Sequence, residues 1–402
     1  MKKIFVICLF FGLPVLLFAQ YFDTPALLVP RVMNAPEISS RAAVLIDAET
    51  GALLYSKNPN EEIPPASLTK LMTMHLLMKE IEEGRAFYDE IIPITTESWA
   101  QSQPPRSSLM FLAPGQIVTL REILLGLAVP SGNDAAVAAA LRISRSMDDF
   151  ADLMTTEGRR MALKVTRFTE ASGISEYNIT TAEEFAFFCR QYINLHPQSL
   201  KDFHSVQDFS YPMAYNVAPA YRDNPRTIRQ ENTNSLLKTF QGVDGLKTGY
   251  IDESGYNIAL TVQRDYTRFI AVILGAESTR RRNTDSIQLL SWAFENFKTV
   301  RPVLESIEKE RLYKGRENNV ELKLARPADF TSPFDRAVSL KYETIINHPL
   351  IAPIPEGGTA GYIIISDDFG ELNRVPLLTV RSYERGNFFK RIWHSILLLF
   401  RK

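Results

Sequence analysis

The chain has 402 residues, 45% hydrophobic and 23% charged, which is typical of a globular protein with a sizeable core and excludes a disordered chain. Because this length exceeds that of one average domain, we expect two domains plus targeting segments. The formal net charge of −1 provides no general attraction to a polyanion, so we expect no nucleic-acid partner.

The first 20 residues have the pattern of a secretory signal peptide. Lys2 and Lys3 precede an apolar run over residues 4–18, and Ala19 offers a small residue for cleavage. This run is shorter than the about 20 residues that a membrane-spanning helix needs. We therefore expect residues 1–20 to be a signal peptide of an exported protein, with an uncleaved anchor as the alternative.

The cysteine content argues against disulfide stabilisation. Cys8 lies in the expected signal peptide, so the mature chain keeps only Cys189, and one cysteine forms no internal disulfide. Cys189 follows three aromatic residues in the apolar stretch 185–189, which predicts a buried helix. We expect this thiol to be a small core side chain and not a nucleophile.

In the roughly 280 residues after the expected signal peptide, hydrophobic periodicity and turn residues predict strands and helices. The expected elements are a strand hairpin over 41–56, a helix over 67–84, two helices over 119–145 broken at Pro130-Ser131-Gly132, helices at both ends of 146–190, two strands over 256–274 and a helix over 284–298. Strands first, helices in the middle, then strands and a helix indicate an antiparallel sheet backed by helices. We therefore expect an α+β fold whose first domain spans residues 21–300.

The pattern changes near residue 300. Short segments with alternating apolar and polar residues follow, which predicts a small, separate all-β domain over 301–386. Residues 387–402 predict an amphipathic helix that anchors the protein to a membrane surface, because aromatic and aliphatic residues share one face and cations the other. A terminal helix that packs on the core is the alternative. The apolar face carries Phe388, Phe389, Ile392, Trp393, Ile396, Leu397 and Phe400, and the polar face carries Lys390, Arg391, His394 and Ser395.

Three short motifs carry the candidate chemistry: Ser67-Leu68-Thr69-Lys70, Ser131-Gly132-Asn133 and Lys247-Thr248-Gly249. Each motif is weak alone, since a serine at the position of Ser67 also fits a helix cap and the second motif also fits a turn between helices. A second Ser-x-x-Lys over 235–238 and a second Ser-x-Asn over 56–58 show how easily such matches arise. One ordered triple places the first motif at the start of a long apolar helix and the last before a strand hairpin.

The chemistry of this triple is acyl transfer. Ser67 needs a base to become a nucleophile, and Lys70, three residues later on the same helix face, is that base if burial or the cation of Lys247 lowers its pKa. The backbone N–H groups of Ser67 and Tyr250 are candidates for an oxyanion hole. Gly249 leaves room for a substrate backbone to approach.

The motifs and their surroundings resemble the low-molecular-mass penicillin-binding proteins, the serine D-alanyl-D-alanine carboxypeptidases. The resemblance implies a β-lactamase/transpeptidase-like catalytic domain, peptidoglycan stem pentapeptides as substrate, β-lactams as inhibitors, and neither a metal nor an organic cofactor. It covers most of residues 37–300 and extends more loosely to the end of the chain. The matching stretches include residues 41–47, 65–70, 131–136, 232–237, 243–250 and 254–257.

This resemblance also implies roles for individual residues. Ser67 is the expected nucleophile, Lys70 its base, and Ser131 and Asn133 assist proton transfer and bind substrate. The substrate's terminal carboxylate is expected to meet Lys247, Thr248 and Arg282, the last chosen from the run 280–282. One residue departs from the family pattern, because Glu170 stands where the family usually has asparagine.

Two other functions stay open. A β-lactamase of class A relies on a glutamate and water for deacylation, but no Glu-x-x-x-Asn motif follows the second motif in the expected setting. A non-catalytic wall-binding protein of the same fold is disfavoured because all three motifs are intact. No Gly-x-Ser-x-Gly or His-Glu-x-x-His motif indicates another hydrolase, and we expect His75 to pack on its helix. We expect the protein at the periplasmic face of the bacterial cytoplasmic membrane.

Overall fold

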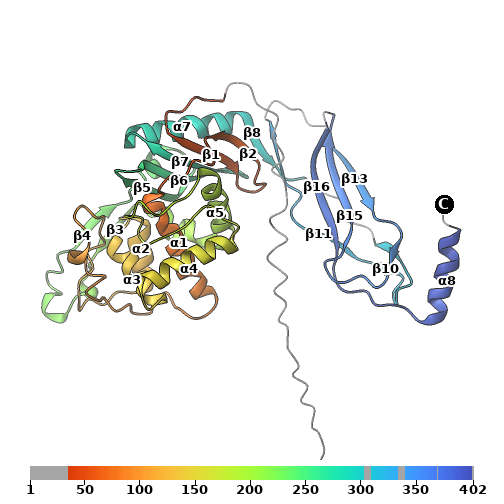
Figure 1. Cartoon of the computed structure of the whole chain (residues 1–402), viewed down its shortest axis with the longest axis horizontal. Helices are drawn as coiled ribbons and strands as arrows, with labels where there is room; N and C mark the ends of the chain where they lie inside the picture. The colour runs from red at the N-terminus through yellow and green to blue at the C-terminus, as the bar shows by residue number, and fades with distance from the viewer. Residues whose placement is uncertain (1–34, 303–308, 334–339, 369, 401–402) are drawn as a thin grey trace, which may run out of the picture.

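The structure, a computed structural model, describes residues 35–302, 309–333, 340–368 and 370–400. The signal peptide expected at residues 1–20 lies outside the described residues. Figure 1 shows a larger body of sheet and helices, a smaller body of strands, and the last helix beside the smaller body. The expected α+β architecture, with an all-β domain and then a terminal helix, is confirmed.

The larger body contains a five-stranded antiparallel sheet. Its strand order is β2 (Leu53–Lys57), β1 (Ala42–Asp47), β7 (Thr267–Ala276), β6 (Gly255–Arg264) and β5 (Val243–Ile251). The central strands are strongly apolar because both faces of the sheet are covered. Alternate residues of a strand face opposite sides, so Val44 and Ile46 of β1 join one apolar cluster while Ala43 and Leu45 join another.

Helices form a layer on each face of this sheet (Figure 1). Thr119, Ser146, Thr181 and Ser278 each accept a backbone N–H of the following helical turn, which explains where four of these helices begin. One layer contains α1 (Lys70–Glu82), α2 (Leu120–Ala128), α3 (Asn133–Ile143), α4 (Met147–Arg160) and α5 (Ala182–Leu195), and the other contains α7 (Thr279–Asn296) with the short α6 (Leu236–Thr239). A small hairpin of β3 (Asp208–Tyr211) and β4 (Ile228–Glu231) completes this body.

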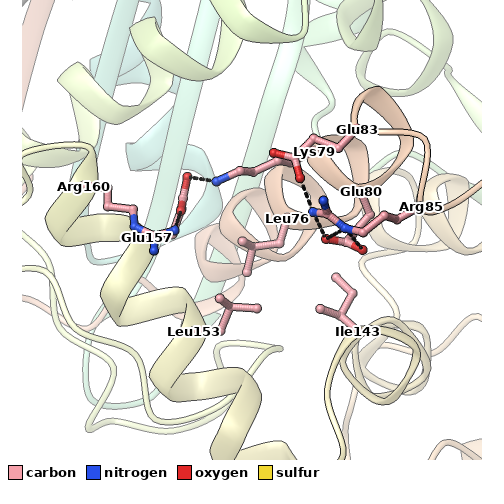
Figure 2. Close-up of a pocket in the computed structure, with 9 residues that line it drawn as sticks. All are labelled: Leu76, Lys79, Glu80, Glu83, Arg85, Ile143, Leu153, Glu157 and Arg160. Atoms are coloured by element: carbon pink, nitrogen blue, oxygen red, sulfur yellow. Dashed lines mark hydrogen bonds and ion pairs between the residues drawn. The ribbon is translucent and has the colours of Figure 1, made fainter. Parts of the chain in front are cut away.

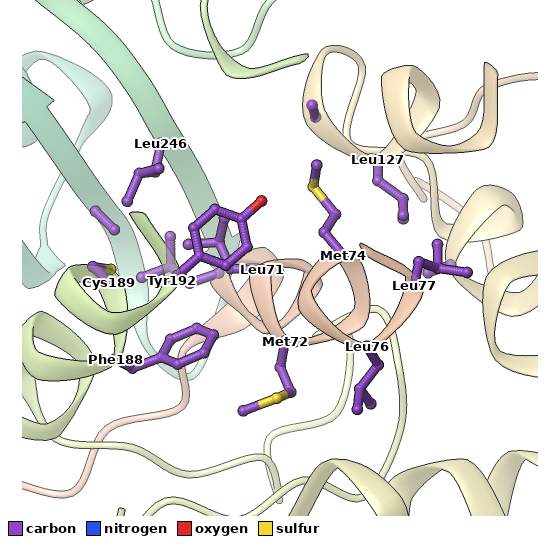
Figure 3. Close-up of a cluster of buried hydrophobic side chains, with 14 of the residues drawn as sticks. Leu71, Met72, Met74, Leu76, Leu77, Leu127, Phe188, Cys189, Tyr192 and Leu246 are labelled. Atoms are coloured by element: carbon purple, nitrogen blue, oxygen red, sulfur yellow. The ribbon is translucent and has the colours of Figure 1, made fainter. Parts of the chain in front are cut away.

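Helix α1 is the centre of the larger apolar cluster. Figure 3 shows its side chains surrounded by residues of other elements, among them Phe188, Cys189 and Tyr192 of α5 and Leu246 of β5. Leu71, Met74 and Leu77 on this helix are fully buried. Because neighbours surround α1, its first turn is held in place. The expected burial of Cys189 is also confirmed.

The smaller body is built of short antiparallel pairs and one parallel pair. Its sheets are β11 (Leu322–Leu324), β16 (Gly370–Thr379), β15 (Thr359–Asp367) and β13 (Lys341–Ile346), in that order, and β10 (Asn319–Val320), β9 (Glu310–Tyr313) and β14 (Leu350–Ile351). A further pair joins β8 (Phe297–Val300), which follows α7 directly, to β12 (Phe330–Pro333). This pair links the two bodies.

A buried carboxylate strengthens that link. Asp47, at the end of β1, is fully buried and accepts hydrogen bonds of 2.8 Å from the hydroxyls of both Thr299 and Thr331. Burial raises the pKa of Asp47 while these hydrogen bonds oppose the rise. The smaller body therefore contacts the first hairpin of the larger one as well as the end of α7.

The last helix, α8 (Phe388–Leu399), turns its polar side toward the smaller body. His394 is buried and accepts a 2.7 Å hydrogen bond from the Lys314 N–H, and the Lys390 ammonium donates to the Arg316 carbonyl at 2.9 Å. Most of its aromatic and aliphatic side chains, including Phe389 and Trp393, are exposed, whereas Leu397 and Leu398 are half-buried. In the described ranges, no helix combines the length and apolar character needed to cross a bilayer.

Several features differ in position from the expectation, and α5, for example, extends to Leu195, beyond the expected limit at residue 190. The helix predicted over 284–298 begins at Thr279 because Ser278 caps it, and it ends at Asn296 because the chain then extends into β8. The Lys247-Thr248-Gly249 motif lies inside β5 and not before a strand pair. Since β5 has a neighbour on one side only, the motif lies on an edge strand of the sheet.

Candidate active site

The Ser67 turn precedes α1. Residues Ala66–Thr69 form a 3₁₀ helix, η2, in which residues three apart lie above one another. This spacing places Lys70 beneath Ser67, and the Lys70 ammonium donates a 3.0 Å hydrogen bond to the Ser67 hydroxyl oxygen. Ser67 is partly exposed, whereas Lys70 is fully buried. The pair therefore has the exposure that a nucleophile and its base require.

Lys70 is held by two more acceptors. Its ammonium donates to Asn133 Oδ1 at 2.8 Å and to the Ser172 carbonyl at 2.6 Å. Burial lowers the pKa of Lys70 to about 7, and the carboxylates of Glu170 and Asp134 oppose this shift. At neutral pH a substantial fraction of Lys70 is thus uncharged and able to accept a proton.

The second motif lies where α2 turns into α3. Ser131 has a φ of 64°, and Asn133 is the first residue of α3, where it reaches Lys70 of α1. Asn133 joins Lys70 through its oxygen and donates from its nitrogen to the Ser107 hydroxyl at 3.2 Å. Ser131 is buried at the turn. Within the described residues its hydroxyl has no hydrogen bond to Ser67 or Lys70, so its part in proton transfer stays a prediction.

The third motif adds positive charge to the same site. Lys247 is almost fully buried, and burial together with the charges of Lys70 and Arg282 lowers its pKa well below the ordinary value. Its ammonium donates to the Thr248 carbonyl at 3.1 Å, and the Thr248 hydroxyl donates to Thr233 at 2.8 Å. Arg282, in the first turns of α7, is 4% exposed, and burial lowers its pKa to about 10. These groups form a cationic region next to Lys70.

Two glycines allow close packing beside Ser67. A Cβ at Gly249 would lie 2.9 Å from the Ser67 nitrogen and from the Pro65 carbonyl oxygen. A Cβ at Gly173, whose φ is +86°, would lie 1.8 Å from the Ala66 oxygen. No larger residue fits either position without moving the Ser67 turn.

Tyr250 follows Gly249 on β5. Its ring is 48% exposed and lies 4.3 Å, between centroids, from the ring of its cross-strand partner Tyr256. Alternate backbone groups of an edge strand point away from the sheet. The place of the Tyr250 N–H in an oxyanion hole stays a prediction.

The other motif matches have structural roles. Ser235 begins α6 and accepts a hydrogen bond from Asn283, while Lys238 pairs with Glu231 at 3.0 Å at the surface. Asn58 has a φ of 43° at the end of β2 and donates to the Arg41 carbonyl. Neither match reproduces the contact between Ser67 and Lys70.

His75 packs as expected. It is buried, and its Nδ1 lies 2.8 Å from Nε2 of His196. The His75 ring also lies against Glu157, which pairs with Lys79. This network is on the side of α1 that faces α4 and α5, away from Ser67.

A surface cavity of about 180 Å³ lies at the other end of α1 from Ser67 (Figure 2). It is lined by residues of α1, the turn after it, α3 and α4. The cations that line it are already paired: Lys79 and Arg160 with Glu157, and Arg85 with Glu80. Since α1 is roughly 20 Å long at 1.5 Å per residue, this cavity is remote from Ser67. It contributes nothing to the site described above.

The loop over residues 164–181 supplies contacts that the motifs did not reveal. Ser172 contributes a backbone carbonyl to Lys70, and Glu170 organises the turn that presents it. A carbonyl acceptor leaves no mark in the sequence, because every residue has one. The sequence pointed to Glu170 in one way, because the family usually has asparagine at this position.

Comparison with known proteins agrees with this geometry. Residues 30–278 match the family model described as D-alanyl-D-alanine carboxypeptidase. The chain belongs to this family. Residues 297–385 match the model of the C-terminal domain of penicillin-binding protein 5. The expected family and enzyme class, a serine-type D-alanyl-D-alanine carboxypeptidase, are confirmed.

Individual members of the D-alanyl-D-alanine carboxypeptidase family align along almost the whole chain. D-alanyl-D-alanine carboxypeptidase DacC of Escherichia coli is 29% identical, covering 95% of this chain and 94% of its own. DacD of the same organism is 32% identical, covering 90% and 92%. The structure of penicillin binding protein 5 from Haemophilus influenzae superposes with a TM-score of 0.78 at 28% identity, covering 88% of this chain and all of its own.

Proposed function

We propose that this carboxypeptidase removes the terminal D-alanine from peptidoglycan stem pentapeptides through an acyl-enzyme on Ser67. The observation that carries the proposal is the 3.0 Å contact between the Ser67 hydroxyl and a fully buried Lys70. Burial lowers the pKa of Lys70 to about 7, which makes it a competent base at neutral pH.

The reaction proceeds in two acyl-transfer steps. Uncharged Lys70 accepts the Ser67 proton while the serine oxygen attacks the carbonyl carbon of the penultimate D-alanine. The peptide bond then breaks, and the proton passes to the amine of the departing D-alanine. Water attacks the resulting ester, Lys70 again takes a proton, and Ser67 is restored. Asn133 holds Lys70 in place and binds the substrate amide, and Ser131 assists the proton transfers.

The cationic region selects the substrate's carboxylate. Lys247, Thr248 and Arg282 surround the position where the C-terminal carboxylate binds, because charge-assisted hydrogen bonds favour an anion there. Gly249 lets the Ser67 turn pack closely against β5, and the N–H groups of Ser67 and Tyr250 stabilise the oxyanion. A β-lactam enters the same site, and its opened ring keeps the leaving nitrogen attached to the acyl group.

Acylation at Ser67 is expected as a persistent penicillin-sized mass increase on one peptide. Incubate the protein without residues 1–20 with penicillin, measure the intact mass, digest it, and locate the adduct by tandem mass spectrometry. An adduct on the peptide that contains Ser67 supports the proposal. Penicillin consumed without an adduct favours the β-lactamase alternative, and untouched penicillin favours a non-catalytic protein.

The proposal includes location and domain division. Residues 1–20 direct export, residues 21–300 form the catalytic domain, 301–386 the β domain, and 387–402 bind the periplasmic face of the cytoplasmic membrane. The orientation of α8 supports the last assignment, because its polar side contacts the protein while Phe389, Trp393 and Phe400 are 81%, 59% and 83% exposed. An exposed aromatic face flanked by cations suits the membrane interface.

Changing this face is expected to weaken membrane binding by at least about 100-fold, since burying one large apolar side chain stabilises by about 1.5–3 kcal/mol. The variant F389E/W393E tests this by co-sedimentation with vesicles of phosphatidylethanolamine and phosphatidylglycerol. Tyr266, 81% exposed on the turn between β6 and β7, provides the matched control Y266E, which should bind as the parent does. Equal binding by all three proteins would contradict the anchoring role of α8.

A further inference from the structure

The loop over residues 170–178 lies directly against the Ser67 turn. Three hydrogen bonds join them: Lys70 to the Ser172 carbonyl at 2.6 Å, Thr73 to the Ala171 carbonyl at 2.7 Å, and Asn178 to the Thr69 hydroxyl at 3.3 Å. Gly173 packs so closely on the Ala66 backbone that no Cβ would fit. The position of Lys70 therefore depends on the shape of this loop.

The carboxylate of Glu170 determines that shape. One oxygen accepts from the N–H and the hydroxyl of Ser172, both at 2.6 Å, and the other accepts from the Gly173 N–H at 2.6 Å and the Asn178 side chain at 2.7 Å. A weaker contact from the Ser175 N–H measures 3.4 Å. Hydrogen bonds to an ionised acceptor are the strong ones, so this carboxylate holds the turn at several points. With its oxygens so engaged, Glu170 is poorly placed to activate a deacylating water.

We propose that Glu170 is a positioning residue for acylation, whose carboxylate holds the 170–178 turn so that the Ser172 carbonyl fixes Lys70 beside Ser67. The inference rests on the proposed roles of Ser67 and Lys70 and adds one for a residue outside the three motifs. Glu170 acts through Ser172, and within the described residues it makes no hydrogen bond to Ser67.

The negative charge of Glu170 also affects the pKa of Lys70, and this effect can be measured in a pH profile. The charged groups that face Lys70 are Glu170 from the loop, Asp134 from α3 and Lys247 from β5, and Arg282 from α7 faces Lys247. Glu170 and Asp134 raise the pKa of Lys70 against the larger effect of burial. Removing the negative charge of Glu170 therefore lowers the pKa of Lys70, and Lys70 then stays uncharged, and active as a base, at lower pH.

The test measures the second-order rate constant of acylation by a fluorescent penicillin from pH 5 to pH 9, approximately the range in which Lys70 titrates. It compares the parent with E170Q, E170A and E176Q. Glu176 is exposed in the same loop, so E176Q removes an equal charge without touching the turn. We expect the acid-side midpoint to fall by about one pH unit in E170Q and E170A and to stay unchanged in E176Q. We also expect the high-pH plateau of E170A to fall about 10- to 100-fold from lost positioning.

The outcomes separate this inference from the proposed function. Unshifted midpoints in E170Q and E170A, with the parent acylated on Ser67, would overturn the role of Glu170. A parent acylated elsewhere would instead refute the proposed function. Thermal melting identifies a variant that fails to fold. If E170A unfolds, the result is taken from E170Q, whose side chain has the same shape as glutamate and keeps one acceptor oxygen.

Discussion

Replacing Ser67 with alanine is expected to abolish penicillin acylation and to lower kcat/KM for D-alanine release by at least about 10⁴-fold, as for other nucleophilic serines. The reason is chemical, since the variant has no oxygen to form the ester while Lys70 and Lys247 keep their positions. The measurement is D-alanine released from a synthetic pentapeptide ending in D-alanyl-D-alanine, together with the intact mass after penicillin treatment.

The chain provides its own control for this experiment. Ser235 belongs to a second Ser-x-x-Lys sequence, but Lys238 pairs with Glu231 and leaves that serine without a base. The variant S235A should therefore match the parent in both assays. Full activity in S67A, or loss of the adduct in S235A, would show that the nucleophile has been assigned to the wrong motif.

Replacing Lys70 is expected to lower the acylation rate about 10³- to 10⁴-fold, and arginine should be as damaging as methionine. Arginine keeps the positive charge but stays protonated at any working pH, so it does not accept the serine proton. In the parent, whose Lys70 has a pKa of about 7, the acylation rate should rise with pH through that value and then level off. Stopped-flow acylation measurements over pH 5 to 9, roughly centred on that titration, provide both results.

Stability separates catalysis from folding in the Lys70 variants. Burial lowers the folded-state pKa of Lys70 below its unfolded value, so between about pH 7 and 10.5 the unfolded chain binds more protons there. Its contribution therefore makes the folded state more stable as pH rises through that window, and at neutral pH the buried ammonium is a cost. K70M should accordingly melt no lower than the parent.

The acylation experiment has its own control. A matching K238M variant, changed at an exposed lysine, should retain full acylation. Acylation by K70R at the parent's rate would contradict the role of Lys70 as base.

The sequence identified the candidate side chains of the site but not the backbone groups that hold them. Ser67, Lys70 and Lys247 carry side-chain chemistry at a fixed order and spacing, and the structure brings them together; their roles in the reaction stay predictions. The contact between Ser67 and Lys70 uses a 3₁₀ turn, which shares the three-residue spacing with an α-helix and so leaves no separate signal. The Ser172 carbonyl was not predictable, because a backbone acceptor depends on chain path and not on residue type.

The fold was predictable where periodicity is local. The apolar helix after Ser67 and the strand hairpin over 256–274 carry clear periods of 3.6 and 2. The pairing of β8 with β12 joins segments about 30 residues apart, and no periodicity specifies which edges meet. The same holds for Asp47, which in the sequence is simply a polar residue before a turn. Its partners Thr299 and Thr331 lie more than 250 residues further on.

The contacts around Asp47 restrict how far Ser67 can move relative to α8. Rotating the β domain away from the catalytic domain would break the β8–β12 pairing and leave a fully buried carboxylate without its threonine partners, which typically costs about 1–3 kcal/mol or more. These contacts therefore oppose rotation of the β domain against the catalytic domain. With α8 lying on the bilayer as proposed, the active site would stay at a nearly fixed distance from the membrane. The enzyme would then act only on peptidoglycan at that distance.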